Sequence, residues 1–435
     1  MKFDRSNQLR QRVHSLIPGG AHTYAKGDDQ YPEGMAPILV RGLGCRVWDV
    51  DDNEFIAYGA GVRSVTLGHA YPPVVEAARR QLDLGANFVR PALIELECAE
   101  AFLEFVPAAD MVKFCKDGSD AVSGALKLAR AATGRDMVAV CRNHPFFAVD
   151  DWFIGSTGMP AGIPDATRAL TVKFDYNDLA SVERLFDEHP DRIAAIVLEA
   201  EKYSPPASGF FVGLRELCDR RGALFILDEM ITGFRWDLGG AQARYEIEPD
   251  LSTFGKALAN GFSVSALAGK REFMRLGGFD HDLERVFLLS TTHGAETHGL
   301  AAAIATMQVY RSEPVIETLW SRGERLASGL KAAASFAGVA DHVPILGPPC
   351  CLVFGSRDET GQPSQPFRTL LMQELIERGI LATSLVVNYS HSEADIDRTI
   401  EAFEGAFAVY RRALDEGIVN YLRGRPVQPA IRPYA

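Results

Sequence analysis

Four groups of polar residues follow short apolar runs, and together they could hold and act on one ligand. The turn Lys116–Ala121 places a glycine and a serine before a helical pattern, so its amides and hydroxyl could bind a phosphate. Glu199 and Asp228 each follow five apolar residues, where a carboxylate needs a cationic partner. Lys256 stands among small and apolar residues, which would desolvate its amine and favour Schiff-base chemistry.

Each of these features, taken alone, also fits a purely structural role. Ser119 or Asp117 could cap the following helix, either carboxylate could cap a strand or form an ion pair, and the lysine could lie on a surface loop. The four groups nevertheless fall together at the carboxyl ends of predicted strands, which is where open α/β sheets bind ligands. Their combination therefore favours one shared site.

The ligand of such a site needs a phosphate, a basic ring nitrogen for a buried carboxylate and an aldehyde for a lysine. Pyridoxal 5'-phosphate has all three, and a carboxylate beside its pyridine nitrogen keeps the ring protonated and able to accept electrons. The chain has 10 lysines, and Lys2, Lys202 and Lys331 lie in polar or surface-helix contexts. We therefore predict a pyridoxal-phosphate enzyme with Lys256 as its lysine and with Glu199 and Asp228 at the cofactor.

Apolar runs and amphipathic segments alternate through the middle of the chain. Four runs of five or six apolar residues predict strands that are buried on both faces: Met111–Cys115, Met137–Cys141, Ile193–Leu198 and Ala223–Leu227. Helical spacing is found in Pro73–Leu84, Leu93–Phe105, Asp120–Ala132, Leu179–Asp187, Leu214–Arg221 and a long segment from about Thr292 to about Arg311. This alternation predicts an α/β fold with a mainly parallel sheet.

The two ends of the chain show a different pattern. Val47–Ile56 reads as a hairpin around an Asp/Asn turn, and Phe367–Arg378 and Glu393–Leu414 have helical spacing. We therefore predict that residues 1–65 begin a small domain, that 66–310 form the large cofactor-binding domain, and that 311–435 complete the small α+β domain.

Composition excludes several classes of protein. A net charge of −12 over 435 residues disfavours nucleic-acid binding through a general basic surface. The seven cysteines show no metal-binding spacing, which predicts buried free thiols and no metal site. Neither a secretory signal nor an apolar run of about 20 residues is visible, so we expect a cytoplasmic protein that does not enter the membrane.

The motifs resemble those of the class III aminotransferases of fold type I, in the branch similar to glutamate-1-semialdehyde aminomutase. The most specific motif is Leu227–Arg235, which is followed by Gly255-Lys256, so that Lys256 lies 28 residues after Asp228. Further matches are Ile17–Gly20, Trp48–Asn53, Leu67–Pro72, Leu126–Arg130 and Gly134–Asp136.

The resemblance implies a role for each matching position. Lys256 holds the cofactor covalently and moves protons, Asp228 pairs with the pyridine nitrogen, and Met230 lies against one face of the ring. Gly118 and Ser119 hold the phosphate.

The resemblance also implies shared active sites. Thr292 matches a threonine that reaches the phosphate from the partner subunit, so a homodimer is expected. Where the family commonly has Tyr-His-Gly, this chain has Asn143-His144-Pro145. The aromatic ring that stacks on the cofactor is therefore replaced by Phe146, Phe147 or His144.

Substrate binding departs from the true aminomutase. Lys26 occupies the place of an arginine that binds the substrate carboxylate, and Arg63 and Arg90 are further candidates, although each also fits a surface ion pair. The mutase's Phe-Glu-Ala-Gly-Phe segment has no counterpart around Leu381–Tyr389. Thr23–Pro32 resembles relatives in surface-polysaccharide and nucleotide-sugar pathways.

Three functions are consistent with these residues. The first is a transaminase that moves an amino group from an amino donor to a carbonyl acceptor, possible settings being sugar, polysaccharide or other specialised biosynthesis. The second is an intramolecular aminomutase, and the third is a non-catalytic relative that binds the cofactor for sensing or assembly. The intact set of Lys256, Asp228, Gly118 and Ser119 argues against the third, and we predict the transaminase.

Overall fold

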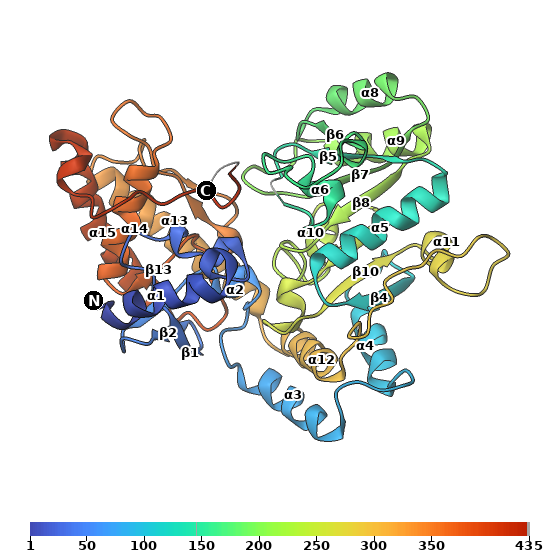
Figure 1. Cartoon of the computed structure of the whole chain (residues 1–435), viewed down its shortest axis with the longest axis horizontal. Coiled ribbons are helices and arrows are strands. Elements are labelled where there is room, and N and C mark those ends of the chain that lie inside the picture. The colour runs from blue at the N-terminus through green and yellow to red at the C-terminus, as the bar shows by residue number, and fades with distance from the viewer. Residues whose placement is uncertain (145, 433–435) are drawn as a thin grey trace. The chain divides into compact units, whose positions relative to one another are not determined.

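The computed structural model describes residues 1–144 and 146–432, and the chain forms two compact units (Figure 1). One unit comprises Met1–Tyr71 with Glu317–Arg432, and the other comprises Pro72–Ile316. The assignment of a large cofactor-binding domain to residues 66–310 and of a small domain to the two flanking segments remains a prediction.

The unit Pro72–Ile316 is built on a seven-stranded sheet with the order β4-β10-β9-β8-β7-β5-β6. Among the described strands, β10 alone runs antiparallel to its neighbours, so the carboxyl ends of the other six lie at one edge. The predicted α/β fold with a mainly parallel sheet is confirmed. In sheet order the strands are β4 (Met111–Cys115), β10 (Ser265–Gly269), β9 (Leu251–Phe254), β8 (Leu224–Asp228), β7 (Ile193–Glu199), β5 (Met137–Cys141) and β6 (Thr171–Phe174).

The helices of this unit pack on the sheet and on one another. Helix α5 lies across β7, β9 and β10, while α12 packs against α3 and α4. The longer helices are α3 (Pro72–Leu84), α4 (Leu93–Leu103), α5 (Gly118–Thr133), α8 (Leu179–Glu188), α9 (Phe210–Arg221) and α12 (Thr297–Ser312). Single-turn helices are α6 (Asp151–Ile154), α7 (Asp165–Arg168), α10 (Gly240–Arg244) and α11 (Arg271–Met274).

The prediction that a helix begins near Thr292 is wrong, because α12 begins at Thr297. The preceding residues form a turn, and the first residue of the helix bonds to another part of the chain. The Thr297 amide donates to the Ala86 carbonyl at 3.0 Å, and its hydroxyl donates to the Gly85 carbonyl at 2.6 Å. Thr292 therefore lies in a loop.

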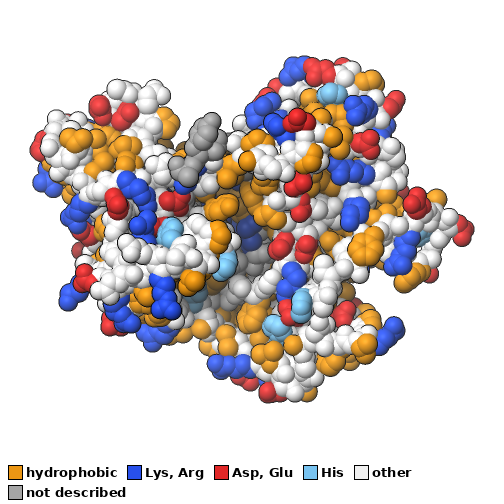
Figure 2. Space-filling view, viewed as in Figure 1, with side chains coloured by type: hydrophobic (Ala, Val, Ile, Leu, Met, Phe, Trp, Pro, Cys, Tyr) orange, Lys and Arg blue, Asp and Glu red, His pale blue; other side chains and the backbone are white. Residues whose placement is uncertain are grey.

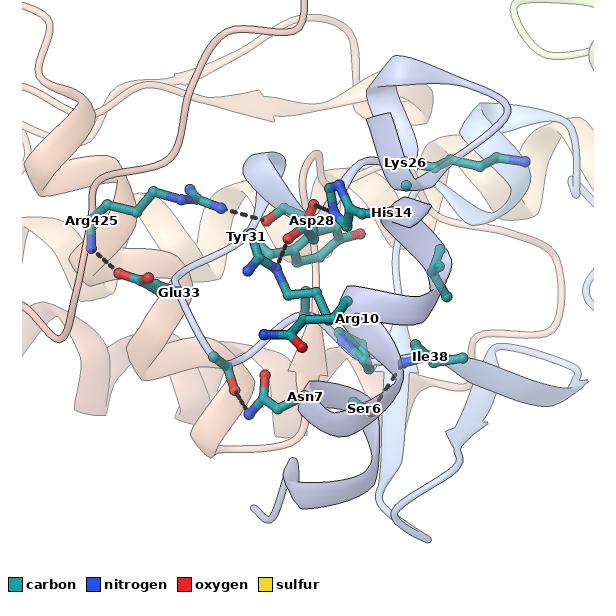
Figure 3. A pocket seen from close by; sticks show the side chains of 16 residues that line it. Ser6, Asn7, Arg10, His14, Lys26, Asp28, Tyr31, Glu33, Ile38 and Arg425 are labelled. Carbon is teal, nitrogen blue, oxygen red and sulfur yellow. Dashed lines mark hydrogen bonds and ion pairs between the residues drawn. The ribbon is translucent and has the colours of Figure 1, made fainter. Parts of the chain in front are cut away.

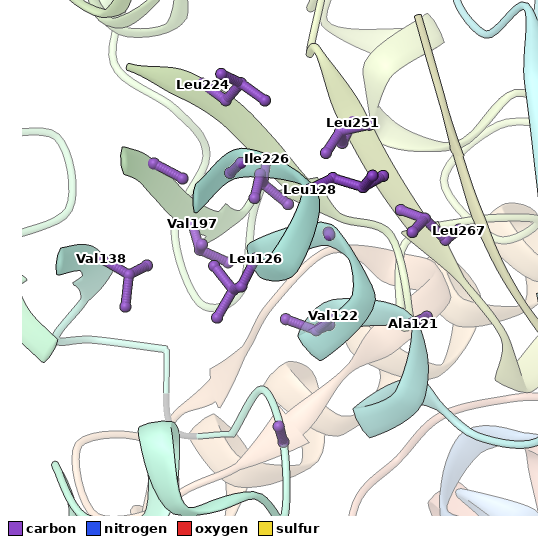
Figure 4. Close-up of a cluster of buried hydrophobic side chains, with 14 of the residues drawn as sticks. Ala121, Val122, Leu126, Leu128, Val138, Val197, Leu224, Ile226, Leu251 and Leu267 are labelled. Atoms are coloured by element: carbon purple, nitrogen blue, oxygen red, sulfur yellow. The ribbon is translucent and has the colours of Figure 1, made fainter. Parts of the chain in front are cut away.

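The core of this unit lies between α5 and the sheet (Figure 4). One face of the helix is buried because its small and apolar residues recur at helical spacing and meet the continuous apolar runs of the strands. The labelled members of the cluster are Ala121, Val122, Leu126, Leu128, Val138, Val197, Leu224, Ile226, Leu251 and Leu267. This packing fixes the start of α5 beside the carboxyl ends of the strands.

The unit of Met1–Tyr71 and Glu317–Arg432 holds a four-stranded sheet with the order β1-β2-β3-β13. The predicted hairpin is confirmed, because β2 and β3 pair antiparallel around Asp51-Asp52. The strands are β1 (Leu39–Leu43), β2 (Arg46–Asp49), β3 (Glu54–Ala57) and β13 (Ile380–Leu381), with a separate pair β11 (Ile345–Leu346) and β12 (Val353–Phe354). The helices are α1 (Asp4–Leu16), α2 (Ala60–Arg63), most of α13 (Val315–Phe336), α14 (Gln365–Glu377) and α15 (Glu393–Glu416).

The cysteines agree with the sequence analysis, since all seven are buried and free. Within the described ranges, no helix is long and apolar enough to cross a membrane. Over the same residues, His, Cys, Asp and Glu side chains form no group of three that could hold a metal ion.

Leu128→Ala tests the core between α5 and the sheet. The Leu128 side chain is fully buried, so its truncation leaves a cavity and should lower the free energy of unfolding by about 2–5 kcal/mol. Urea denaturation followed by tryptophan fluorescence measures the change. Leu283→Ala is the matched control, because Leu283 is 62% exposed and its loss should cost less than about 0.5 kcal/mol. Equal effects in the two variants would contradict this description of the core.

Candidate active site

The predicted chemical groups of the larger unit lie at one edge of its sheet. Glu199 ends β7 and Asp228 ends β8, and the two residues are paired neighbours in the parallel ladder. Lys256 follows the end of β9, and the Lys116–Ala121 turn joins β4 to α5. Because these strands point the same way, their carboxyl ends bring the four groups together, as predicted.

Met230 joins the turn before α5 to the loop that carries Lys256. A Cβ atom placed on either Gly118 or Gly255 would lie 2.7 Å from the Met230 Sδ, so the Met230 side chain lies close to both backbones. At Gly255 the added atom would also lie 2.5 Å from the Ser265 hydroxyl. The thioether is therefore held between the two segments that the sequence assigns to the cofactor.

Asp228 is buried and only half satisfied. Its Oδ1 accepts hydrogen bonds from the Met230 amide at 2.8 Å and from the Thr253 hydroxyl at 3.3 Å. Its Oδ2 has no hydrogen-bond partner among the described residues. Burial, reinforced by the charge of Glu199, raises the pKa of Asp228 to about 7, although Lys256 opposes the shift. The free oxygen suits a cationic ring nitrogen.

Glu199 lies beside Asp228 and has a cation of its own. Lys202 Nζ is 3.2 Å from the Glu199 Oε1, and both side chains are largely buried. The other oxygen, Oε2, is buried without a hydrogen-bond partner among the described residues. Burial alone would raise the pKa of Glu199, but the charges of Lys202 and Lys256 help to bring it below its usual value. Glu199 is therefore ionised at neutral pH.

Lys256 has an unusual backbone and lies close to both carboxylates. Its φ is 41°, in the left-handed region that non-glycine residues seldom adopt. Its side chain is half-buried, and its charge lowers the pKa of both Glu199 and Asp228. A strained, partly desolvated lysine is suited to carrying a reactive amine.

The start of α5 carries the predicted phosphate-binding groups. Asp117 caps the helix by accepting a hydrogen bond from the Asp120 amide at 3.0 Å, as the structural alternative predicted. Ser119 accepts a hydrogen bond from the Val149 amide at 3.1 Å, which leaves its hydroxyl hydrogen available for donation. The cap and an anion site are compatible, because the Gly118 and Ser119 amides still lie in the first turn.

His144 is the candidate ring that the structure brings to the carboxylates. Its Nδ1 accepts the Glu199 amide hydrogen at 3.0 Å, so the neutral imidazole carries its proton on Nε2. Burial lowers the pKa of His144 to about 4, which keeps it neutral. Phe147 is buried in the core, and half-exposed Phe146 packs edge-on against Phe153 at 5.8 Å. Pro145 lies outside the described residues.

The two other predicted site residues of this unit, Thr292 and Arg90, lie at its exposed surface. Thr292 is exposed, and its carbonyl accepts a hydrogen bond from the Asn87 side chain at 3.0 Å. Arg90 is exposed on the segment before α4. Lys26 and Arg63 belong to the other compact unit. The substrate roles of Lys26, Arg63 and Arg90 remain predictions.

A cavity of about 290 Å³ lies in the other unit, among α1, the turns that follow it and Arg425 (Figure 3). Its charged groups pair with one another. Asp28 bonds to Arg10 and His14, and Glu33 accepts the Arg425 amide hydrogen at 2.8 Å. The Lys26 ammonium extends away from the Arg10–Asp28 pair (Figure 3). The cavity therefore adds no reactive group to the candidate site.

The sequence analysis missed Lys202 and Thr253. We expected Lys202 in a polar context, but its side chain is only 12% exposed and is paired with Glu199. The sequence signal for this pairing was the opposite charge of Lys202 three residues after Glu199. Thr253 bonds to Asp228 because the two are neighbours across β8 and β9, a pairing that spacing along the chain does not reveal.

Comparisons with known proteins agree with the fold. Residues 29–407 match the model of the class III aminotransferase family. The glutamate-1-semialdehyde 2,1-aminomutase of Desulforamulus reducens is 33% identical over 95% of this chain and 99% of its own.

Two solved structures are also similar over nearly the whole chain. The FumI protein of Sphingopyxis sp. MTA144, solved in its pyridoxal-phosphate internal aldimine form, has a TM-score of 0.87 and 29% identity, covering 98% of this chain and 99% of that one. An omega-transaminase from Sphaerobacter thermophilus has a TM-score of 0.83 and 26% identity, covering 93% of this chain and 97% of that one.

The fold and these similarities define a pyridoxal-phosphate-dependent enzyme of fold type I. The chain belongs to the class III aminotransferase family. The residues present fit the cofactor. Within the described residues the Oδ2 atom of buried Asp228 makes no hydrogen bond, a lysine stands nearby, and the first turn of α5 offers amides and a hydroxyl to a phosphate.

Asp228→Asn and Glu229→Gln should have opposite effects on stability. Glu229 uses both oxygens, accepting hydrogen bonds from the Ala241 amide at 3.0 Å and the Gln242 amide at 2.8 Å. An amide group there loses one bond and should cost about 1–3 kcal/mol. At Asp228 the new amide nitrogen can take the place of Oδ2, so no bond is lost. Thermal unfolding of the cofactor-free proteins measures both, and a large loss in Asp228→Asn would contradict the assignment.

The effect of Asp228→Asn should also depend on pH. The raised pKa means that the folded protein keeps a proton that the unfolded chain releases above its ordinary pKa of 3.8, so stability falls as pH rises toward 7. Asparagine removes this cost. The stabilisation by Asp228→Asn should therefore be about 2 kcal/mol larger at pH 8 than at pH 5.5. A gain that does not grow with pH would show that the carboxyl is ionised throughout this range.

Proposed function

We propose that the protein is an intermolecular transaminase that moves an amino group from an amino donor to a carbonyl acceptor. The observation that carries this proposal is the cluster of Lys256, Asp228 and Glu199 at one sheet edge, in the unit Pro72–Ile316, beside the first turn of α5. We also propose that this unit holds the cofactor. The domain assignment of residues 1–65, 66–310 and 311–435 is part of the same proposal.

The residues divide the chemistry among them. When bound, pyridoxal phosphate supplies an aldehyde that condenses with amines and a pyridine ring that accepts electrons. Lys256 would hold the cofactor through its aldehyde and would act as general acid and base toward the substrate. Asp228 would pair with the ring nitrogen, and Gly118 and Ser119 would hold the phosphate.

Two further residues flank the ring in this proposal. Met230, fixed between Gly118 and Gly255, limits one side. His144, neutral and held by the Glu199 amide, presents the ring that replaces the family's tyrosine. Phe146 remains the alternative, since it is half-exposed at the start of the segment that leads to α6.

The segment Leu381–Tyr389 favours a transaminase over an intramolecular aminomutase. It contains no acidic residue, and Leu385, Val386 and Val387 are buried. The carboxylate that the true mutase carries in this segment therefore has no replacement there. Lys26, in place of the mutase's arginine, points to an altered acceptor, and a keto-sugar is one acceptor worth testing.

We further propose a homodimer in which Thr292 serves the partner's site. Large apolar side chains are exposed along α3, α4 and the segment between them, and apolar side chains gather over these elements (Figure 2). They are Leu82, Leu84, Phe88, Val89, Leu93 and Leu96. Contiguous exposed apolar surface supports association, and Thr292 lies near its edge, bonded to Asn87.

Amino donors added to the purified protein, one at a time and without an acceptor, test the proposal. At least one donor should convert the cofactor's aldehyde absorption band to that of its amine form, with release of one oxo acid per site. Lys256→Ala should lower the rate of conversion by roughly 10²–10⁴-fold or more while keeping the same circular dichroism. Lys331→Ala, on the α13 surface, should leave the rate unchanged.

The same assay separates the two reactions. Turnover of a single amino-aldehyde such as glutamate-1-semialdehyde, with no separate donor, would favour the aminomutase. Near-normal conversion by Lys256→Ala would contradict both assignments.

A further inference from the structure

Lys202 is a second buried lysine at the candidate site. Its ammonium lies 3.2 Å from the Glu199 Oε1, and its side chain is 12% exposed while that of Glu199 is 4% exposed. It comes from the segment that follows β7, whereas Lys256 comes from the segment that follows β9. The cluster thus contains two buried carboxylates and two lysines.

The two carboxylates compete for positive charge. Glu199 and Asp228 are neighbours in the β7–β8 ladder, and each is buried where water cannot screen it. Lys256 acts on both of them, so one lysine has to serve two anions unless another cation is present. Among the groups that lower the pKa of Glu199, Lys202 has the largest effect. Lys256 therefore remains available for its reaction.

The ion pair uses only one of the two carboxylate oxygens of Glu199. Lys202 meets one oxygen, and the other is buried without a partner among the described residues. The His144 ring cannot neutralise the carboxylate, because it is uncharged and accepts the backbone amide of Glu199 rather than donating to its side chain. A pair formed for stability alone would gain from satisfying both oxygens, since each unpaired one costs energy.

We propose that Lys202 is a positioning residue that neutralises Glu199, so that Asp228 is free to ionise against the ring nitrogen of the cofactor. The inference rests on the proposed role of Asp228. In this role Lys202 acts through the charge of Glu199 and touches neither substrate nor cofactor. Without Lys202, Glu199 and Asp228 have one lysine between them, and the pair retains a proton that weakens the contact with the ring nitrogen.

The test is the affinity of the full-length enzyme for pyridoxal phosphate, measured by dialysing holoenzyme against graded cofactor concentrations. Lys202→Met should weaken binding at least tenfold, and Lys202→Arg should stay within threefold of the unmodified protein. The double variant Glu199→Gln/Lys202→Met should regain at least half of the lost affinity on a logarithmic scale. A packing role of the Lys202 side chain, independent of the charge of Glu199, predicts no such rescue.

A control removes a lysine that pairs with another buried carboxylate. Lys270 Nζ lies 2.6 Å from Asp250, and the side chains are 37% and 6% exposed, but Asp250 precedes β9 and lies at the opposite edge of the sheet. Lys270→Met should therefore leave the cofactor affinity unchanged. Equal losses in Lys202→Met and Lys270→Met would overturn the proposal, because the effect would then follow from losing any lysine that pairs with a buried carboxylate.

Each remaining outcome also decides the question. Wild-type affinity in Lys202→Met, or a double variant no better than Lys202→Met, overturns the inference and leaves the proposed function intact. If Lys202→Met does not fold, the double variant decides, since tight cofactor binding supports the proposal and weak binding by a folded protein overturns it. An unmodified protein that binds no cofactor overturns both this inference and the proposed function.

Discussion

Two ionisable carboxyl groups, Glu199 and Asp228, end neighbouring strands in the dry interior of the larger unit. Placing two like charges there is costly unless cations stand within a few ångströms. Much of the site follows from this constraint. Lys202 pairs with Glu199, Lys256 stands close to both, and Asp228 keeps one oxygen for a further cation. In the proposed function, this oxygen receives the positively charged ring of the cofactor.

The fold supplies this arrangement through strand direction and not through any single loop. Strands β7, β8 and β9 are parallel neighbours, so residues distant in the chain end at the same level. The turn before α5 reaches the same edge because β4 runs parallel to β9 on the far side of β10. Met230 then fills the space between that turn and the Lys256 loop, against Gly118 on one side and Gly255 on the other.

The sequence predicted the parts of the site that depend on local pattern. Apolar runs that end in a carboxylate placed Glu199 and Asp228 at strand ends, because a continuous apolar run is what a strand buried on both faces requires. Strands β6, β9 and β10 were not predicted, because hydroxylated, charged or small residues interrupt their apolar runs. It also began α12 too early, since the helix start depends on contacts with Gly85 and Ala86, more than 200 residues away.

Lys202 shows the limit of reading residues one at a time. A lysine beside Glu201 and Tyr203, followed by prolines, is typical of an exposed loop. Its burial becomes necessary only when Glu199 is known to be beside Asp228, a fact of strand pairing. The charge balance of the site is therefore a tertiary property even where each member has a recognisable local context.

The neighbouring residues Asp228 and Glu229 are both buried carboxyl groups, but one is available for chemistry and the other has a structural role. Burial raises the pKa of each to about 7. Both oxygens of Glu229 accept hydrogen bonds, from two amides of the α10 turn and from the Thr232 hydroxyl. These bonds fix the loop after β8. One oxygen of Asp228 accepts hydrogen bonds from the Met230 amide in its own loop and from the Thr253 hydroxyl of β9. Because the loop is already held by Glu229, the free oxygen of Asp228 is not needed for folding and is available for chemistry.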